Sequence, residues 1–112
     1  MKFNSNKQKE LFNAIEGSGM QVFSCGPKGV SANLVGKFTI RKNHKGEDQL
    51  DVDDGTNHVH IDWTLVTRFE VGEFHGEGML TFFNNELSLF KFYRLEGPYS
   101  NSIDELSGSL TD

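Results

Sequence analysis

Residues 79–93 read MLTFFNNELSLFKFY, and this stretch decides the fold class. Two apolar runs flank the pair Asn84-Asn85, which is the pattern of a β-hairpin. Successive residues of a strand point to opposite faces, and apolar side chains here fall on both of them: Phe82, Phe83, Leu89, Phe90 and Phe92. One face is therefore expected to meet the core, and the other a helix, a ligand or a second subunit.

The segments upstream of the hairpin carry the same two-residue period. This period predicts strands over residues 20–25, 34–41, 50–52, 58–62 and 67–71. Turn-forming residues separate the first four of them, at 26–29, 43–47 and 53–55. The three glycines between Gly72 and Gly78 indicate a mobile loop or a wide turn before the hairpin. Together these patterns predict about seven strands.

Helical periodicity flanks the strands at both ends of the chain. Ser5 and Gln8 form a capping-box pattern ahead of an apolar stripe, which predicts an amphipathic helix over residues 5–16. Ser102 and Glu105 repeat that pattern, and a second helical stripe follows: Ile103, Leu106 and Leu110. A chain of 112 residues is the size of one domain. We therefore predict a single α+β domain over residues 1–112, mainly an antiparallel β-sheet with flanking N- and C-terminal helices.

Charge and composition argue against several classes of function. A net charge of −5 disfavours nucleic-acid binding, which needs a basic stripe against the phosphates. The one dense basic stretch is interpreted as a solvated loop: Lys37, Arg41, Lys42 and Lys45. No apolar run approaches the ~20 residues of a membrane span, and no apolar leader opens the chain. Because Cys25 is the single cysteine, no intrachain disulfide can form, and we expect a cytoplasmic protein.

The sequence His58-Val59-His60 is the sharpest candidate for ligand binding. On a strand its two imidazoles project the same way, about 7 Å apart at the backbone, and Asp62 shares their face. Imidazole is a common ligand of zinc and of heme iron. A zinc site would need further ligands brought by folding: His44, His75 or Cys25. The alternative interpretation is a polar face turned to solvent.

Signals for catalysis are weak. A lone cysteine such as Cys25 is more often a packing residue than a nucleophile, and no GxSxG sequence is present. The glycines at 72, 76 and 78 lack the strand-to-helix context of a dinucleotide fingerprint. The sequence therefore favours a binding protein over an enzyme.

Five short phrases follow one another in the second half of the chain. They are HVHI at 58–61, EFHG at 73–76, LTFFN at 80–84, LFKF at 89–92 and DEL at 104–106. In this order they resemble the cytosolic heme-utilisation carrier family (ChuX/HutX-like proteins). Members of that family carry a His-containing strand, an ERxFxG segment, an FFNxxG turn, an MFKVF strand and an acidic-Leu ending. The resemblance covers about residues 20–110 and is clearest from 58 to 106.

The resemblance implies an assembly and a ligand. Members pair as dimers through an antiparallel sheet, which would cover the second apolar face of the hairpin. They bind heme in a cleft with a histidine near the iron. The family's histidine aligns with His58 without a gap, or with His60 if two residues are missing between the motifs, and both stay open.

The sequence also departs from the family's pattern. The family's second, upstream histidine has no counterpart, although Cys25 lies near its place and thiolate is a known heme ligand. Val71-Gly72-Glu73 stands where the arginine of ERxFxG is expected, and residues 95–98 replace the family's RDE segment. The resemblance therefore supports the fold more strongly than the ligand set.

Heme requires an apolar slot and cations for its propionates. The side chains that could wall such a slot are Phe74, Met79, Phe82 and Phe90. The cations that could lie at its edge are Arg41, Arg68, Lys91 and Arg94. The alternative interpretation places these aromatic rings in the core or in a dimer interface.

Three hypotheses follow for the function. The leading one is a non-enzymatic heme-binding or heme-trafficking protein, a homodimer that takes heme or another tetrapyrrole. The second is an interaction or small-molecule-binding module that has kept the fold and lost heme ligation. The third is a heme-degrading protein, which would need an electron donor.

Overall fold

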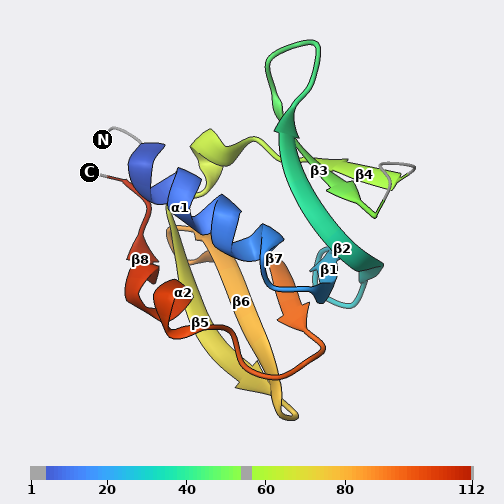
Figure 1. Cartoon of the computed structure of the whole chain (residues 1–112), viewed down its shortest axis with the longest axis vertical. Coiled ribbons are helices and arrows are strands. Elements are labelled where there is room, and N and C mark those ends of the chain that lie inside the picture. The colour runs from blue at the N-terminus through green and yellow to red at the C-terminus, as the bar shows by residue number, and fades with distance from the viewer. Residues whose placement is uncertain (1–4, 54–56, 112) are drawn as a thin grey trace.

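The described residues form one sheet of eight antiparallel strands in the order β4-β3-β2-β1-β7-β6-β5-β8 (Figure 1). The structure is a computed structural model, and it describes residues 5–53 and 57–111. The elements in chain order are α1 (Ser5–Glu16), β1 (Met20–Cys25), β2 (Ala32–Lys42), β3 (Asp48–Val52), β4 (Asn57–His60), the 3-10 helix η1 (Trp63–Leu65), β5 (Arg68–Phe74), β6 (Glu77–Asn84), β7 (Leu87–Arg94), α2 (Asn101–Leu106) and β8 (Gly108–Ser109). The predicted α+β class and the mainly antiparallel sheet are confirmed. The predicted turn at 53–55 lies partly outside the described residues.

Two runs of neighbouring strands meet at the centre of the sheet. Strands β1 to β4 follow one another as hairpins, and so do β5 to β7. The pairing of β1 with β7 joins the two runs and sets Phe23 opposite Phe92. This pairing of two strands that are far apart in the sequence places β1 beside the hairpin at residues 79–93.

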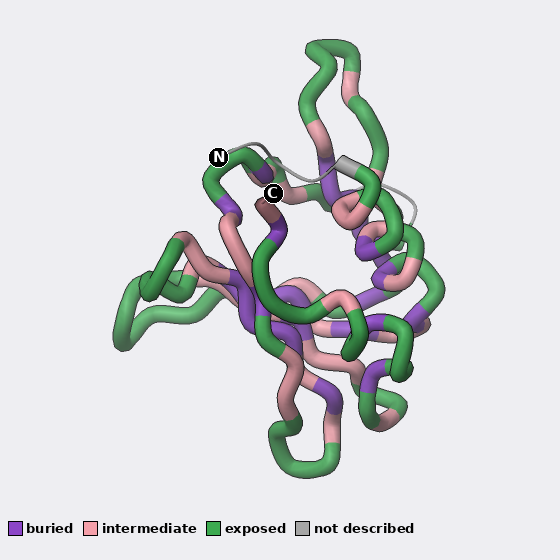
Figure 2. The backbone as a smooth tube through the Cα atoms, turned by 90° about the vertical axis from the view of Figure 1, so that its left-hand side faces the viewer, coloured by how far each residue is buried: buried purple, intermediate pink, exposed green. Residues whose placement is uncertain are grey.

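One face of the sheet, here called the inner face, holds the core. Two aromatic and aliphatic rows cross the strands on this face: Phe23, Phe92, Leu80 and Val71, then Cys25, Phe90, Phe82 and Phe69. Helix α1 covers it with Leu11 and Ile15, both fully buried. The opposite, outer face is more exposed, and exposure is greatest at the hairpin tips (Figure 2).

The segment from Gly72 to Gly78 corrects a prediction. It is not a wide loop, because β5 continues to Phe74 and β6 begins at Glu77. His75 and Gly76 alone form the turn, both with positive φ, at 51° and 83°. Two consecutive left-handed residues match the right-handed twist of a hairpin, so the strands run to the turn without splaying.

The C-terminal helix is also shorter than predicted. It ends at Leu106, and Gly108, with a φ of 107°, starts the short strand β8 beside β5. The amide of Leu110 donates to the carbonyl of Thr67 at 2.8 Å, and the Leu110 side chain is fully buried. Leu110 therefore packs into the core from the bend that follows β8, and not from a helical stripe.

A buried polar network ties the segment after β7 to the sheet. The hydroxyl of Tyr99 donates to Oε1 of Gln21 at 2.7 Å, and Nε2 of Gln21 donates to the carbonyl of Ile15 at 2.8 Å. Burial raises the pKa of Tyr99, which keeps the hydroxyl protonated and able to donate. Because both partners are buried, the hydrogen bonds satisfy groups that could not reach water.

Candidate functional site

The paired histidines lie on the outer face of β4, at one edge of the sheet. Val59 sits between them and packs toward the core opposite Leu50, so period-two geometry turns both imidazoles outward. The ring centroids of His58 and His60 are 5.0 Å apart, with an interplanar angle of 88°, and both residues are exposed. The two histidines therefore share a face, as predicted, and a ligand can reach it. Asp62 does not belong to this strand, because β4 ends at His60 and Asp62 caps η1.

A buried polar layer supports these imidazoles on the neighbouring strand. In register, His58 lies opposite Asp51 and His60 opposite Gln49. Both β3 residues are only 6% exposed, although their side chains point to the outer face. Nε2 of Gln49 donates to Oδ1 of Asp51 at 2.7 Å, and Nε of Arg41 donates to Oδ2 at 2.5 Å.

These hydrogen bonds stabilise the charged form of Asp51. The bond from Gln49 lowers the pKa of Asp51 most, and the bond from Arg41 adds to it. Burial acts in the opposite direction, and the net pKa lies below the usual value of 3.8. Asp51 therefore stays a carboxylate well into the acid range while the sheet is folded.

Replacing Asp51 by asparagine is expected to remove a pH-dependent part of the stability. A carboxyl group with a depressed pKa stabilises the fold above its unfolded value, and this stabilisation is lost as the pH falls through the folded pKa. The difference in free energy of unfolding between the wild type and Asp51→Asn should thus be full at pH 7 and shrink below about pH 3.8. Urea denaturation at pH 7, 4 and 3 measures it. A difference that stays constant over this range would contradict the depressed pKa.

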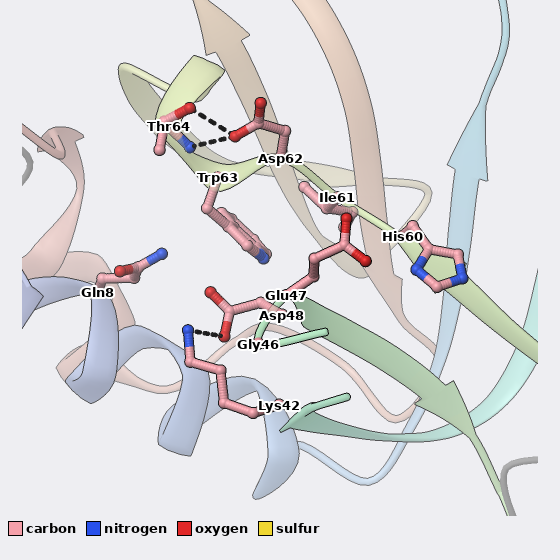
Figure 3. A pocket seen from close by; sticks show the side chains of 10 residues that line it. All are labelled: Gln8, Lys42, Gly46, Glu47, Asp48, His60, Ile61, Asp62, Trp63 and Thr64. Carbon is pink, nitrogen blue, oxygen red and sulfur yellow. Dashed lines mark hydrogen bonds and ion pairs between the residues drawn. The ribbon is translucent and has the colours of Figure 1, made fainter. Parts of the chain in front are cut away.

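Two open cavities adjoin this cluster, and His60 lines both. The smaller, of about 410 Å³, is lined on the outer face by polar and charged side chains: Arg41, Asn43, His44, Lys45, Glu47, Gln49, His58 and His60. The larger, of about 610 Å³, lies between the start of α1, the β2–β3 hairpin and the segment after β4 (Figure 3). It adds two apolar walls, Ile61 and Trp63. His60 and Glu47 stand at the junction of a cationic cavity and a partly apolar one.

Several of the polar groups in the larger cavity already have partners. Lys42 pairs with Asp48 at 2.9 Å, and Asp62 accepts from the backbone amide of Thr64 at 3.1 Å (Figure 3). Among the described residues, Nε2 of Gln8 is the one buried side-chain nitrogen or oxygen without a hydrogen-bond partner. An unsatisfied buried donor beside a cavity is a position that water or a ligand oxygen can fill.

The sheet separates the predicted site residues into two groups. Cys25, Phe82 and Phe90 share the inner face, where Cys25 lies directly opposite Phe90. Phe82 and Phe90 fill the core, so a ligand approaching from solvent cannot contact their ring faces in this conformation. Cys25 lies on the opposite side of the sheet from His58 and His60. One iron within a single chain therefore cannot take ligands from both.

Four further predicted residues lie on the outer face, away from the histidines: Phe74, Met79, Lys91 and Arg68. Arg94 lies opposite Gln21 on the inner face and donates to the carbonyl of Ser18 at 3.0 Å. Met79 lies opposite Tyr93, and the ring of Phe74 is 5.7 Å from that of Tyr93. Lys91 faces Thr81 on the same side. Arg68 already has partners on this surface. Its guanidinium donates to the carboxylate of Glu70 at 2.5 Å and lies 3.9 Å from the centroid of the Phe83 ring. These four side chains form a surface of their own on β5–β7.

An apolar row crosses five strands on this outer surface. Its members lie in register: Val35, Val22, Tyr93, Met79 and Gly72. Val35 is 53% exposed, and Phe74 extends the row with 51% exposure. The expectation that the hairpin has apolar side chains on both faces is met by this row on one side and the core on the other.

The sequence did not single out the residues that support and flank the histidines. Gln49 and Asp51 alternate with the core residues Leu50 and Val52, which is a detectable signal for polar side chains on the outer face. Their contact with Arg41 depends on the pairing of β2 with β3 and could not be read from local sequence. Ile61 and Trp63 lie within three residues of His60 in the sequence, but their place beside it in the cavity depends on the turn into η1.

Within residues 5–53 and 57–111, no group of three or more His, Cys, Asp or Glu side chains is arranged to hold a metal ion. His44 does reach the smaller cavity beside the paired histidines, as a zinc site would have required, but Cys25 does not. No helix in the described part of the chain has the length and apolar character needed to cross a membrane.

Comparisons with known proteins identify the fold. No family model and no curated protein matches the sequence. A crystal structure of a protein from Erwinia carotovora superposes with a TM-score of 0.61 at 18% identity, covering 93% of this chain and 70% of that one. The crystal structure of ChuX superposes with a TM-score of 0.60 at 16% identity, covering 90% and 68%. The chain thus has the fold of ChuX, in agreement with the resemblance of its motifs.

Proposed function

We propose that this protein is a heme-binding or heme-trafficking protein of the ChuX/HutX type, with His60 as the axial ligand of the iron. The observation that carries the proposal is the position of His60, an exposed imidazole at the junction of a cationic cavity and a partly apolar one. The fold shared with ChuX and the ordered motifs of the sequence support it. His58 lines only the cationic cavity and not the partly apolar one, so it is the weaker candidate.

The residues around His60 fit the chemical groups of heme. Imidazole nitrogen suits the iron, and Arg41 and Lys45 supply positive charge for the propionates on one side of His60. Ile61 and Trp63 supply apolar surface for the porphyrin on the other side. The cavities of about 410 and 610 Å³ lie within the range of small-molecule sites. Bound heme would supply an iron centre, and His60 would be the residue that holds it.

The protein's own contribution would be reversible binding. His60 stands on an exposed edge strand, so another protein's ligand can approach the iron without local unfolding. Asp51 and Gln49 lie opposite the two histidines on β3, and the hydrogen bond between their side chains holds them in place there. A carrier must hold its heme and also release it. An iron-binding histidine at the edge of the sheet allows both binding and release.

The proposal includes a homodimer in the cytoplasm, as the family resemblance implies. The apolar row from Val35 to Phe74 is the surface that a second copy would cover. Two such rows facing each other would remove exposed valine and phenylalanine side chains from water, which favours association. Light scattering of the purified protein should then give twice the mass of one chain.

A heme titration followed through the Soret band tests the proposal. The wild type is expected to saturate at one heme per chain. His60→Ala should weaken binding by about tenfold or more, because the axial ligand is lost, and His58→Ala by much less. His75→Ala, in the β5–β6 turn outside both cavities, is the matched control and should bind as the wild type does.

The possible outcomes separate the claims. Weak, unsaturable absorbance shared by all four proteins would mean adsorption and would refute the heme proposal. A specific loss in His58→Ala alone would keep the function and move the ligand to His58.

A second candidate is an interaction or small-molecule-binding module with the same fold. The polar lining of the smaller cavity favours it, since all the described residues that line this cavity with His58 are polar or charged. Under this alternative the wild type would show no saturable heme binding, while a small polar ligand would shift the imidazole resonances of His58 and His60 in an NMR titration.

A further inference from the structure

Arg41 is held through one nitrogen and leaves its two others free. Its Nε donates to Asp51, while within residues 5–53 and 57–111 neither terminal nitrogen has a hydrogen-bond partner. The side chain is 54% exposed and lines the smaller cavity together with both histidines. The two terminal nitrogens of a guanidinium form a planar fork that matches the two oxygens of a carboxylate.

Asp51 and Gln49, which are buried on β3, fix the orientation of this guanidinium. Both oxygens of Asp51 are occupied, Oδ1 by Gln49 and Oδ2 by Arg41, so the carboxylate cannot rotate without breaking a hydrogen bond. Asp51 and Gln49 are buried, which strengthens both interactions and limits their motion. A guanidinium anchored in this way loses little conformational freedom when it binds an anion.

The charges around the fork favour a ligand anion. Lys45, His44 and the two β4 histidines line the same cavity, and Glu47 is the one carboxylate among its described lining residues. Glu47 itself accepts a hydrogen bond from Asn43 at 3.2 Å. An anionic group placed at Arg41 would therefore meet positive or neutral side chains on most sides.

We propose that Arg41 binds a carboxylate of the ligand through its two terminal nitrogens, so that the site selects tetrapyrroles with free propionates. This inference rests on the proposed heme function and names the residue that gives it selectivity. Asp51 and Gln49 act as positioning residues, because they hold the guanidinium and would not touch the ligand.

The test compares ligands that differ only in the carboxylate or only in the iron. Heme, heme dimethyl ester and iron-free protoporphyrin are each titrated into the wild type, Arg41→Ala, Arg41→Lys and Asp51→Asn, following porphyrin absorbance or fluorescence. Lys37→Ala is the matched control, since Lys37 lies on the same strand and face as Arg41 but outside both cavities.

The wild type is expected to bind heme at least about tenfold more tightly than its dimethyl ester. Arg41→Ala should lose that preference, Arg41→Lys should keep only part of it because a point charge replaces the fork, and Asp51→Asn should reduce it without changing affinity for the ester. Iron-free protoporphyrin should show the same dependence on Arg41. His60→Ala, titrated with this porphyrin as well, should bind it as tightly as the wild type does. Lys37→Ala should behave as the wild type.

Each failure has its own signature. If the wild type binds heme and its ester equally, or if Arg41→Ala keeps the preference, the role of Arg41 is overturned and the heme function stands. If the wild type binds neither heme nor protoporphyrin saturably, the proposed function falls, and the inference falls with it.

Discussion

Phe82→Ala is expected to lower the free energy of unfolding by about 3–5 kcal/mol, the range for removing a fully buried phenylalanine. The Phe82 ring stacks between those of Phe69 and Phe90, with centroid distances of 5.4 and 4.8 Å. It also meets Trp63 and Phe92 edge-on, at 5.7 and 5.9 Å. Alanine would leave a cavity at the point where these four rings meet, and the antiparallel sheet restricts its collapse. Urea denaturation followed by circular dichroism measures the loss.

A surface phenylalanine provides the matched control. Phe74 is 51% exposed on the outer face, so Phe74→Ala should cost less than about 1 kcal/mol. Phe82→Leu, which keeps most of the volume, should fall between the two and remain folded if the alanine variant does not. Equal effects of Phe82→Ala and Phe74→Ala would contradict the division of the aromatic residues between core and surface.

Gly78→Ala is expected to cost about 2–3 kcal/mol, as overpacking of a rigid site does. A Cβ atom at Gly78 would lie 2.7 Å from both the backbone nitrogen and the ring of Tyr99, and 3.0 Å from the carbonyl of Gly97. Two of these contacts are to backbone atoms, which cannot turn away as a flexible side chain would. The amide of Gly78 also donates to that carbonyl at 3.0 Å, so the segment after β7 is fixed against the strand.

Gly72→Ala tests whether the effect comes from the close backbone approach. Gly72 lies in the adjacent strand β5. Among the described residues, the one atom that its added Cβ would meet is the terminal methyl carbon of Met79, at 3.3 Å. Because that methyl group can move, we expect a change of less than about 1 kcal/mol. Thermal denaturation of both variants makes the comparison. Similar losses at the two positions would mean that strand propensity, and not the contact with Tyr99, sets the cost.

The local sequence predicted the elements well where one pattern dominated. The hairpin at residues 79–93, the strand at 20–25 and the helix at 5–16 follow from period-two and helical patterns, and the structure has them. Between Gly72 and Gly78 the glycines predict a loop, and this prediction is wrong, because the strands β5 and β6 continue to a two-residue turn. Gly76 serves the turn, whereas Gly78 makes room for the chain near Tyr99, a contact about 20 residues away in sequence.

The sequence by itself determined which side chains share a face: His58 with His60, and Phe90 with Phe92. The alternation of strand side chains is a local property of the backbone, so it can be read without knowing any neighbour. The same property predicted that residues 79–93 would need cover on both sides.

Only the tertiary structure decided which face is inside and what stands next to each side chain. The pairing of β1 with β7 put Cys25 against Phe90 on the inner face, across the sheet from the histidines. The pairing of β2, β3 and β4 put Arg41, Asp51 and His58 into one cluster. Neighbours across strands depend on sheet order and register, which arise from the burial of the whole core, so no local pattern can specify them.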